Sequence, residues 1–133
     1  MSEGNVGIVR QAYERFNAGD VEGFMELCAP DFEFQDLPSL PGSGVFEGHE
    51  GFRAWWAQLA DAFDQLRFQP EGFVEATGDR VLAENHATGL GKGSRANVEM
   101  SMYNVWTLRD GRVISLRTYE DRTQALEAAG LSE

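Results

Sequence analysis

The stretch ANVEMSMYNVWTLRDGRVISLRTY, residues 96–119, contains two alternating runs joined by a tight turn signal. Along residues 96–108 the larger apolar side chains recur at every second position, which is the period of a strand with one face on a core. The turn Arg109–Arg112 has Asp-Gly at its centre, a pair that favours two-residue hairpin loops. Residues 113–119 continue as the partner strand. The stretch therefore predicts a β-hairpin.

Two further strands are expected before this hairpin. Val81–Leu90 is a second long strand, and residues 66–76 form another that is interrupted near Pro70. The turn signal Thr77–Arg80 joins them, and the glycine-rich residues 89–94 lead into the hairpin. Because all these connections are short, we expect an antiparallel meander of four long strands.

The first half of the chain has a different periodicity. Apolar residues spaced by three and four positions predict helices over 5–17, 21–28 and 48–63. A short strand, 31–35, and a proline-rich loop, 36–44, lie between them, and a short helix follows Asp121. The fold class is α+β: a cone-shaped curved antiparallel sheet of about four long strands plus a short one, wrapped around three N-terminal helices, with a short C-terminal helix. Such a cone encloses a cavity suited to a small ligand.

Composition narrows the class of protein. The 133 residues fit one domain, 1–133, and the net charge of −11 opposes binding to nucleic acid or to anionic membranes. The lone Cys28 excludes an internal disulfide, and we expect it to be a buried small apolar residue at a helix end. The sequence shows neither a signal peptide nor a membrane span, so a cytoplasmic location is expected.

Chemical motifs are scarce. We find no phosphate loop, no dinucleotide fingerprint and no nucleophile elbow, so no cofactor is expected. His49-Glu50 lacks a second histidine one turn later, and no metal site is expected. Chemistry in this protein would therefore depend on acid-base groups in a cavity.

Five stretches together form a familiar pattern: Tyr13–Asp20, Ala29–Phe34, Phe46–Gly51, Val105–Val113 and Ala125–Leu131. With them the chain resembles, over nearly its whole length, the SnoaL-like branch of the nuclear transport factor 2-like superfamily. That group includes ketosteroid isomerases, polyketide cyclases and limonene-epoxide hydrolases. The resemblance implies a ligand between helices and sheet and a homodimer through the outer sheet face.

The resemblance to the isomerases assigns roles residue by residue. Asp36, just after the short strand, matches the position of the catalytic base. The oxyanion-hole tyrosine falls at Ala12, with Tyr13 one residue along and about 100° around the helix, so this donor is expected to be missing from its role. Asn104 matches the protonated aspartic acid, and its amide can still donate a hydrogen bond.

The strand Val81–Leu90 leaves two interpretations open. Counting positions against the isomerase pattern turns Glu84 and His86 toward the cavity, where His86 would exchange protons with Asp36 or substrate. The alternative is a solvent-facing strand with Asn85 at a dimer seam. On the next strand, Met102, Asn104 and Trp106 are expected to face the cavity.

The sequence thus predicts an isomerase-like or cyclase-like enzyme that abstracts a proton next to a carbonyl of an apolar oxygenated substrate. Asp36, His86 and Asn104 are the candidate catalytic residues. The candidate substrate contacts are Tyr13, Trp56, Phe63, Glu84, Met102 and Trp106. The alternatives are a non-catalytic ligand-binding or dimeric scaffold domain and, ranked lower, an epoxide hydrolase, for which Arg95, Arg109 and Arg117 show no inward register.

Overall fold

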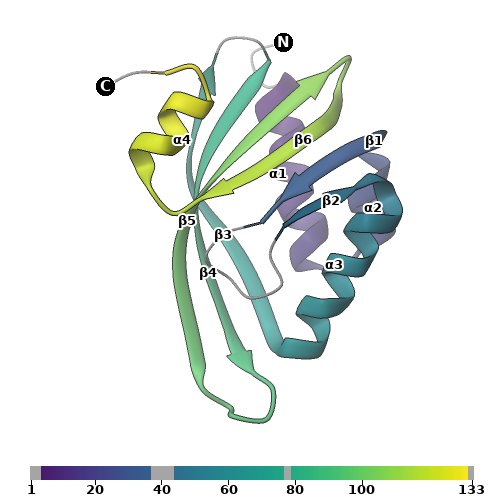
Figure 1. Ribbon diagram of the computed structural model, residues 1–133, viewed down its shortest axis with the longest axis vertical. Coiled ribbons are helices and arrows are strands. Elements are labelled where there is room, and N and C mark those ends of the chain that lie inside the picture. Colours follow the sequence, from purple (N-terminus) through teal and green to yellow (C-terminus); the bar gives the residue numbers. More distant parts are fainter. Residues whose placement is uncertain (1–3, 37–43, 77–78, 132–133) are drawn as a thin grey trace.

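The computed structural model of the chain describes residues 4–36, 44–76 and 79–131. Within them, six strands form one curved mixed sheet in the order β2-β1-β6-β5-β4-β3 (Figure 1). The strands are β1 Cys28–Gln35, β2 Val45–Glu47, β3 Phe63–Ala76, β4 Arg80–Gly91, β5 Asn97–Arg109 and β6 Arg112–Tyr119. The predicted α+β class and the meander of four long strands are confirmed.

Strands β3 to β6 pair antiparallel in chain order, as the short turns between them require. The alternation of residues 96–108 is confirmed, because Met102, Asn104, Trp106 and Leu108 are all buried. Strand β3 runs through Pro70 instead of stopping there, and its register with β4 shifts between Pro70 and Gly72. A bulge therefore replaces the predicted interruption.

The sheet is not entirely antiparallel. Strand β1 lies parallel to β6, and the three-residue strand β2 adds an antiparallel edge beside β1. The chain arrives at β1 from a helix rather than from a hairpin, so β1 can run in the same direction as β6. The prediction missed β2 because three residues carry too little periodicity to indicate a strand.

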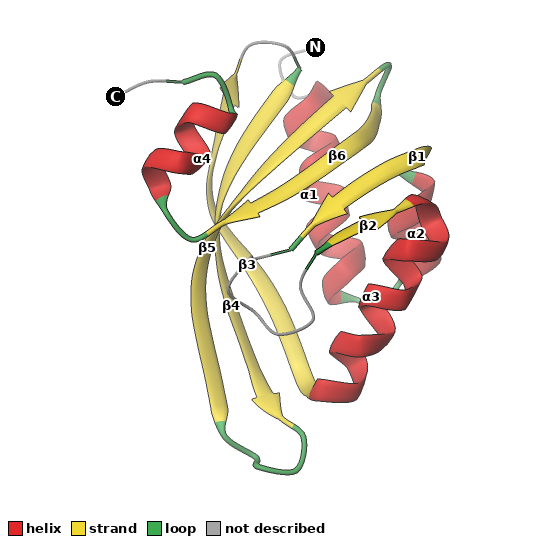
Figure 2. Cartoon of the chain, in the orientation of Figure 1, coloured by secondary structure: helices red, strands yellow, loops and turns green. Residues whose placement is uncertain are grey.

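Three helices cover one face of the sheet, namely α1 Gly4–Asn17, α2 Val21–Glu26 and α3 Gly48–Ala62. The short helix α4, Arg122–Ala128, lies on the opposite side (Figure 2). Its Ala125 and Leu126, together with Ala129 just after it, are buried against Leu82 and Val105 of the outer face. Both faces of the central strands are therefore partly covered, which explains why β4 and β5 have apolar residues on both sides.

Aromatic side chains fill much of the space between the helices and the sheet. The rings of Phe24 and Phe52 stack with centroids 4.6 Å apart and planes 6° apart. Phe16 of α1 lies 4.3 Å from Trp56 and 4.6 Å from Phe68. Rings of this size bury large apolar areas and hold the three helices at fixed positions on the sheet.

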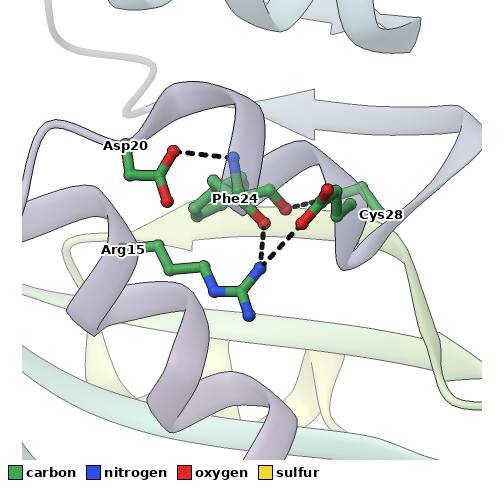
Figure 3. A network of polar contacts seen from close by, with 6 residues as sticks. Arg15, Asp20, Phe24 and Cys28 are labelled. Carbon is green, nitrogen blue, oxygen red and sulfur yellow. Dashed lines mark hydrogen bonds and ion pairs between the residues drawn. The ribbon is translucent and has the colours of Figure 1, made fainter.

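Polar contacts fix the junction between α1 and α2 (Figure 3). Asp20 accepts a 2.9 Å hydrogen bond from the Gly23 amide and caps α2. Arg15 donates to the Gly23 carbonyl at 2.6 Å. Cys28 lies just beyond, as the first residue of β1 rather than the predicted end of the helix, and its sulfur contacts the Phe24 carbonyl at 3.6 Å.

The cap gives a test of this junction. Asp20→Ala removes the acceptor for the Gly23 amide, so we expect the free energy of unfolding to fall by about 1 kcal/mol. Urea denaturation followed by circular dichroism measures the change. Glu26→Ala, which loses an exposed ion pair to Arg15, is the matched control and should change stability by less than about 0.5 kcal/mol. Equal effects of the two substitutions would show that the cap contributes nothing specific.

Candidate functional site

A cavity of about 330 Å³ lies between the three helices and the inner face of the sheet. Its lining is mostly aromatic and aliphatic, with rings from α1, α2 and α3 opposite side chains of β4 and β5. The volume is at the lower end of the range for small-molecule sites, and the lining has the mixture of many apolar and few polar groups that such sites show. Five of the polar lining residues are Tyr13, Asp36, Asn85, Asn104 and Thr118.

Four of these five polar residues form one connected network with Trp106. The Tyr13 hydroxyl donates to Asn104 Oδ1 at 2.6 Å and accepts from Trp106 Nε1 at 3.1 Å. Asn85 Nδ2 donates to the same Asn104 oxygen at 3.1 Å. Asn104 Nδ2 in turn donates to Thr118 Oγ1 at 3.1 Å. The network links α1 to β4, β5 and β6, so it fixes these side chains in orientation as well as in position.

Burial changes the acidity of Tyr13. Removal from water raises the pKa of its hydroxyl far above the ordinary value of 10.0, and the hydrogen bond with Trp106 offsets only part of that rise. The hydroxyl is therefore protonated throughout the physiological range and can donate a hydrogen bond.

Asp36 brings a carboxylate to the cavity. It follows β1, is half-buried, and its Oδ2 accepts a 2.8 Å hydrogen bond from Trp55 Nε1 of α3. Asp36 is the one acidic residue among the described residues that line the cavity. The indole therefore orients a carboxylate in a largely apolar space, an arrangement that suits a general base.

Most of the predicted site residues line the cavity. The structure brings together there Tyr13, Asp36, Phe63, Met102, Asn104 and Trp106. Trp56 is not in the lining, because its ring packs against Phe16 and other core rings. Residues 37–43, which complete the predicted loop after Asp36, lie outside the described residues.

The predicted direction of Glu84 and His86 is wrong. Glu84 is exposed, and His86 Nε2 lies 3.0 Å from the exposed Glu99 carboxylate on the outer face. Residues Ala83, Asn85 and Ala87 face inward instead. The inward-facing residues of β4 are small, so they do not form the run of large apolar side chains that indicates a buried strand face. The large rings that fill this space come from the helices instead. The alternative of a solvent-facing strand is correct for His86 but wrong for Asn85, which faces the cavity and is buried rather than at an outer dimer seam.

Sequence reasoning also missed parts of the site. The Tyr13 hydroxyl reaches the cavity, where it donates its proton to Asn104 Oδ1. The expectation that this tyrosine is missing from the oxyanion-binding role stays a prediction. Asn85, Trp55 and Thr118 were not candidates. The one signal for Asn85 was its position between alanines on a strand without a large apolar face. An amide in such a position indicates a polar side chain that is hydrogen-bonded to a partner.

The Cys28 thiol is a reactive group outside the cavity, within the described part of the chain. Burial raises the pKa of the Cys28 thiol to about 12, so at neutral pH Cys28 is a protonated, buried side chain, as expected of a packing residue. Within residues 4–36, 44–76 and 79–131, no three His, Cys, Asp or Glu side chains gather as a metal-binding group. None of the helices in these ranges is long and apolar enough to cross a membrane.

The curved sheet, the three covering helices and the enclosed apolar cavity define an α+β cone that holds its site between helices and sheet. A family model described as SnoaL-like domain matches residues 9–116. The chain therefore belongs to the SnoaL-like family. That a single domain extends over the whole of 1–133 stays a prediction.

Solved structures of the same fold are numerous. A nuclear transport factor 2-like protein from Burkholderia xenovorans LB400 is 31% identical, with a TM-score of 0.75, and the match covers 96% of this chain and 95% of that one. A protein from Jannaschia sp. CCS1 assigned as a SnoaL-like polyketide cyclase is 25% identical, with a TM-score of 0.75 and coverage of 98% and 94%. TerC, co-crystallised with polyporic acid, is 24% identical, with a TM-score of 0.79 and coverage of 95% and 97%. None of the curated proteins compared matches the chain.

The raised pKa of Tyr13 gives a test of the network. An unfolded tyrosine ionises near pH 10, whereas folded Tyr13 keeps its proton, so its contribution to stability is present below pH 10 and is lost as the pH rises further. Tyr13→Phe should therefore lose less stability than the wild type between pH 9 and pH 11, by about 1 kcal/mol.

Urea denaturation at both pH values measures the difference. Tyr119→Phe removes a half-buried tyrosine outside the cavity and is the matched control. If Tyr13→Phe and the wild type lost equal stability over this interval, the hydroxyl would not be held protonated as described.

Proposed function

We propose that this protein binds a small, mostly apolar, oxygenated molecule in the cavity and abstracts a proton next to its carbonyl group, as in an isomerisation or a cyclisation. The observation that carries the proposal is the presence of Asp36 in an aromatic cavity that also contains the amide of Asn104. A base and a hydrogen-bond donor in one enclosed space are the two groups that enolate formation requires.

Asp36 is the base in this proposal. Its carboxylate would take the proton from the carbon beside the carbonyl and return it to a neighbouring carbon or to the product. The hydrogen bond from Trp55 holds the carboxylate in one orientation, which reduces the reorganisation needed when substrate is bound.

Asn104 is the donor that holds the developing oxyanion. A primary amide has two N–H groups, and Asn104 gives one of them to Thr118. The proposal assigns the other to the substrate oxygen. Tyr13 and Asn85 both donate to Asn104 Oδ1, so they hold the amide in the orientation that presents its nitrogen. A single donor of this kind contributes roughly 10²–10³ in rate.

His86 has no part in this mechanism, since it lies on the outer face beside Glu99. The epoxide hydrolase alternative also loses support. The described lining contains no arginine, and Arg95, Arg109 and Arg117 are exposed.

The relatives support a small-molecule site. One structure with this fold was solved with polyporic acid and another with trimethylamine, and a third relative is assigned as a polyketide cyclase.

The same cavity would also serve a non-catalytic binding protein, which is the alternative function. The polar network is compatible with this non-catalytic alternative, because most of the network's hydrogen bonds are made within the protein.

Proton abstraction can be measured without the natural substrate. We expect the wild type to accelerate exchange of the acidic C–H protons of 2-tetralone in D₂O, followed by proton NMR. Asp36→Asn keeps an oxygen for Trp55 to bond but removes the base, so exchange should fall by about 10²–10⁴-fold. The variant should retain the fold.

Asp31→Asn is the matched control, because Asp31 is an exposed carboxylate on β1 and its loss should leave exchange unchanged. Exchange at the wild-type rate in Asp36→Asn would refute the assignment of the base. Binding of 2-tetralone without any exchange in the wild type would favour the non-catalytic alternative.

We also propose a cytoplasmic homodimer that pairs through the outer sheet face. This face is free of α4 around His86, Ser101 and Glu99, where polar side chains already bond across β4 and β5. Light scattering should give a mass of about twice 14.8 kDa. A monomeric mass at micromolar concentration would contradict the dimer but not the cavity chemistry.

A further inference from the structure

One polar atom in the site has no partner among the residues that the structure describes. Asn85 is 2% exposed, faces inward from β4 and lines the cavity. Its Nδ2 donates to Asn104, but its Oδ1 is buried and has no hydrogen-bond partner among the described residues. Such an atom costs roughly 1–3 kcal/mol if nothing bonds to it. Asn85 lines the cavity, so a hydrogen-bond donor on a molecule bound there would satisfy this oxygen.

The direction of the hydrogen bonds determines which side-chain atom of Asn85 has no hydrogen-bond partner. Trp106 Nε1 is a donor only, so the Tyr13 oxygen must accept from it. The Tyr13 proton then goes to the neighbouring atom of Asn104, 2.6 Å away, which must be the acceptor Oδ1. With Oδ1 there, the nearest atom of Asn85 must be its donor Nδ2. The remaining atom of Asn85 is its oxygen.

The opposite arrangement, with both amides turned over, is less favourable. Tyr13 would then receive N–H groups from Trp106 and Asn104, and its own proton would lose its acceptor. The NH₂ group of Asn85, now in the place of its oxygen, would also lack a hydrogen-bond acceptor. Turning the amides over therefore leaves the Tyr13 proton and the Asn85 NH₂ group unsatisfied in place of one oxygen, and each unsatisfied buried group is costly. The indole of Trp106 thus fixes Asn85 as an acceptor.

We infer that Asn85 is a substrate-recognition residue whose Oδ1 accepts a hydrogen bond from a hydroxyl group of the ligand. The inference deepens the proposed function: it narrows the apolar oxygenated substrate to a hydroxylated one, a phenol, enol or alcohol. Nearby lining residues on β4 and β5, Ala87 and Met102, offer only apolar contact, so a ring can lie beside them with its hydroxyl at Asn85.

A pair of probes of matched shape tests the inference. 2-Naphthol can donate a hydrogen bond, whereas its methyl ether, 2-methoxynaphthalene, cannot. We expect the wild type to bind 2-naphthol about tenfold more tightly, measured by isothermal titration calorimetry, because the ether leaves Oδ1 without a donor. The extra methyl group of the ether works against this difference, so a preference for the naphthol is not a result of size.

Four variants separate recognition from packing. Asn85→Leu, with Asn85→Ala as a smaller replacement, should reduce the preference to about onefold in the folded protein. Tyr13→Phe should also weaken it, because Asn104 and Asn85 can then turn over without leaving a tyrosine proton unsatisfied. Thr88→Val changes another polar lining residue on β4 and should preserve the preference.

The outcomes are distinguishable. Equal binding of the two probes by the wild type, or tighter binding of the ether, would overturn this inference and leave the proposed proton abstraction standing. An undiminished preference in both Asn85 variants would also overturn it. Failure of the wild type to bind either probe would count against the ligand cavity itself, and so against the proposed function as well.

Discussion

The hydrogen bond between the Tyr13 hydroxyl and Asn104 Oδ1 is the contact on which the interior depends. It joins α1 to the centre of the sheet across 91 positions of sequence, and both side chains are buried. A pair of polar groups in such a space is stable only when each finds its partner. The bond therefore fixes how the helix lies on the sheet and which atoms face the cavity, and both properties follow from one short contact.

The two ends of the site are held in different ways. Asn104 is embedded in a network of four side chains from three strands and a helix, which gives it one orientation. Asp36, which follows a strand, accepts a hydrogen bond from the indole of Trp55. A firmly held donor and a carboxylate in the same cavity suit the proposed reaction, in which the oxygen stays in place while a proton moves between carbons.

Local patterns were sufficient to predict most of the fold. The Asp-Gly turn, the alternation of residues 96–108 and the helical stripes each depend on neighbours in sequence, and the structure confirms them. The direction of β1 and the presence of β2 depend on distant pairing, and they were missed. Within the site, the inward face of β4 could not be read from the strand itself. Its alanines face inward because Tyr13 and the helical rings occupy the space, which is a property of the assembled protein.

The two edge strands of the sheet, β2 and β3, affect whether the protein aggregates at high concentration. An unpaired strand border invites hydrogen bonding with other copies of a chain. Here β2 is only three residues long, and β3 carries Pro70, which has no N–H to offer, next to a register shift. The exposed charges of Arg67, Glu71 and Glu75 follow the same border. These features disfavour strand-by-strand aggregation.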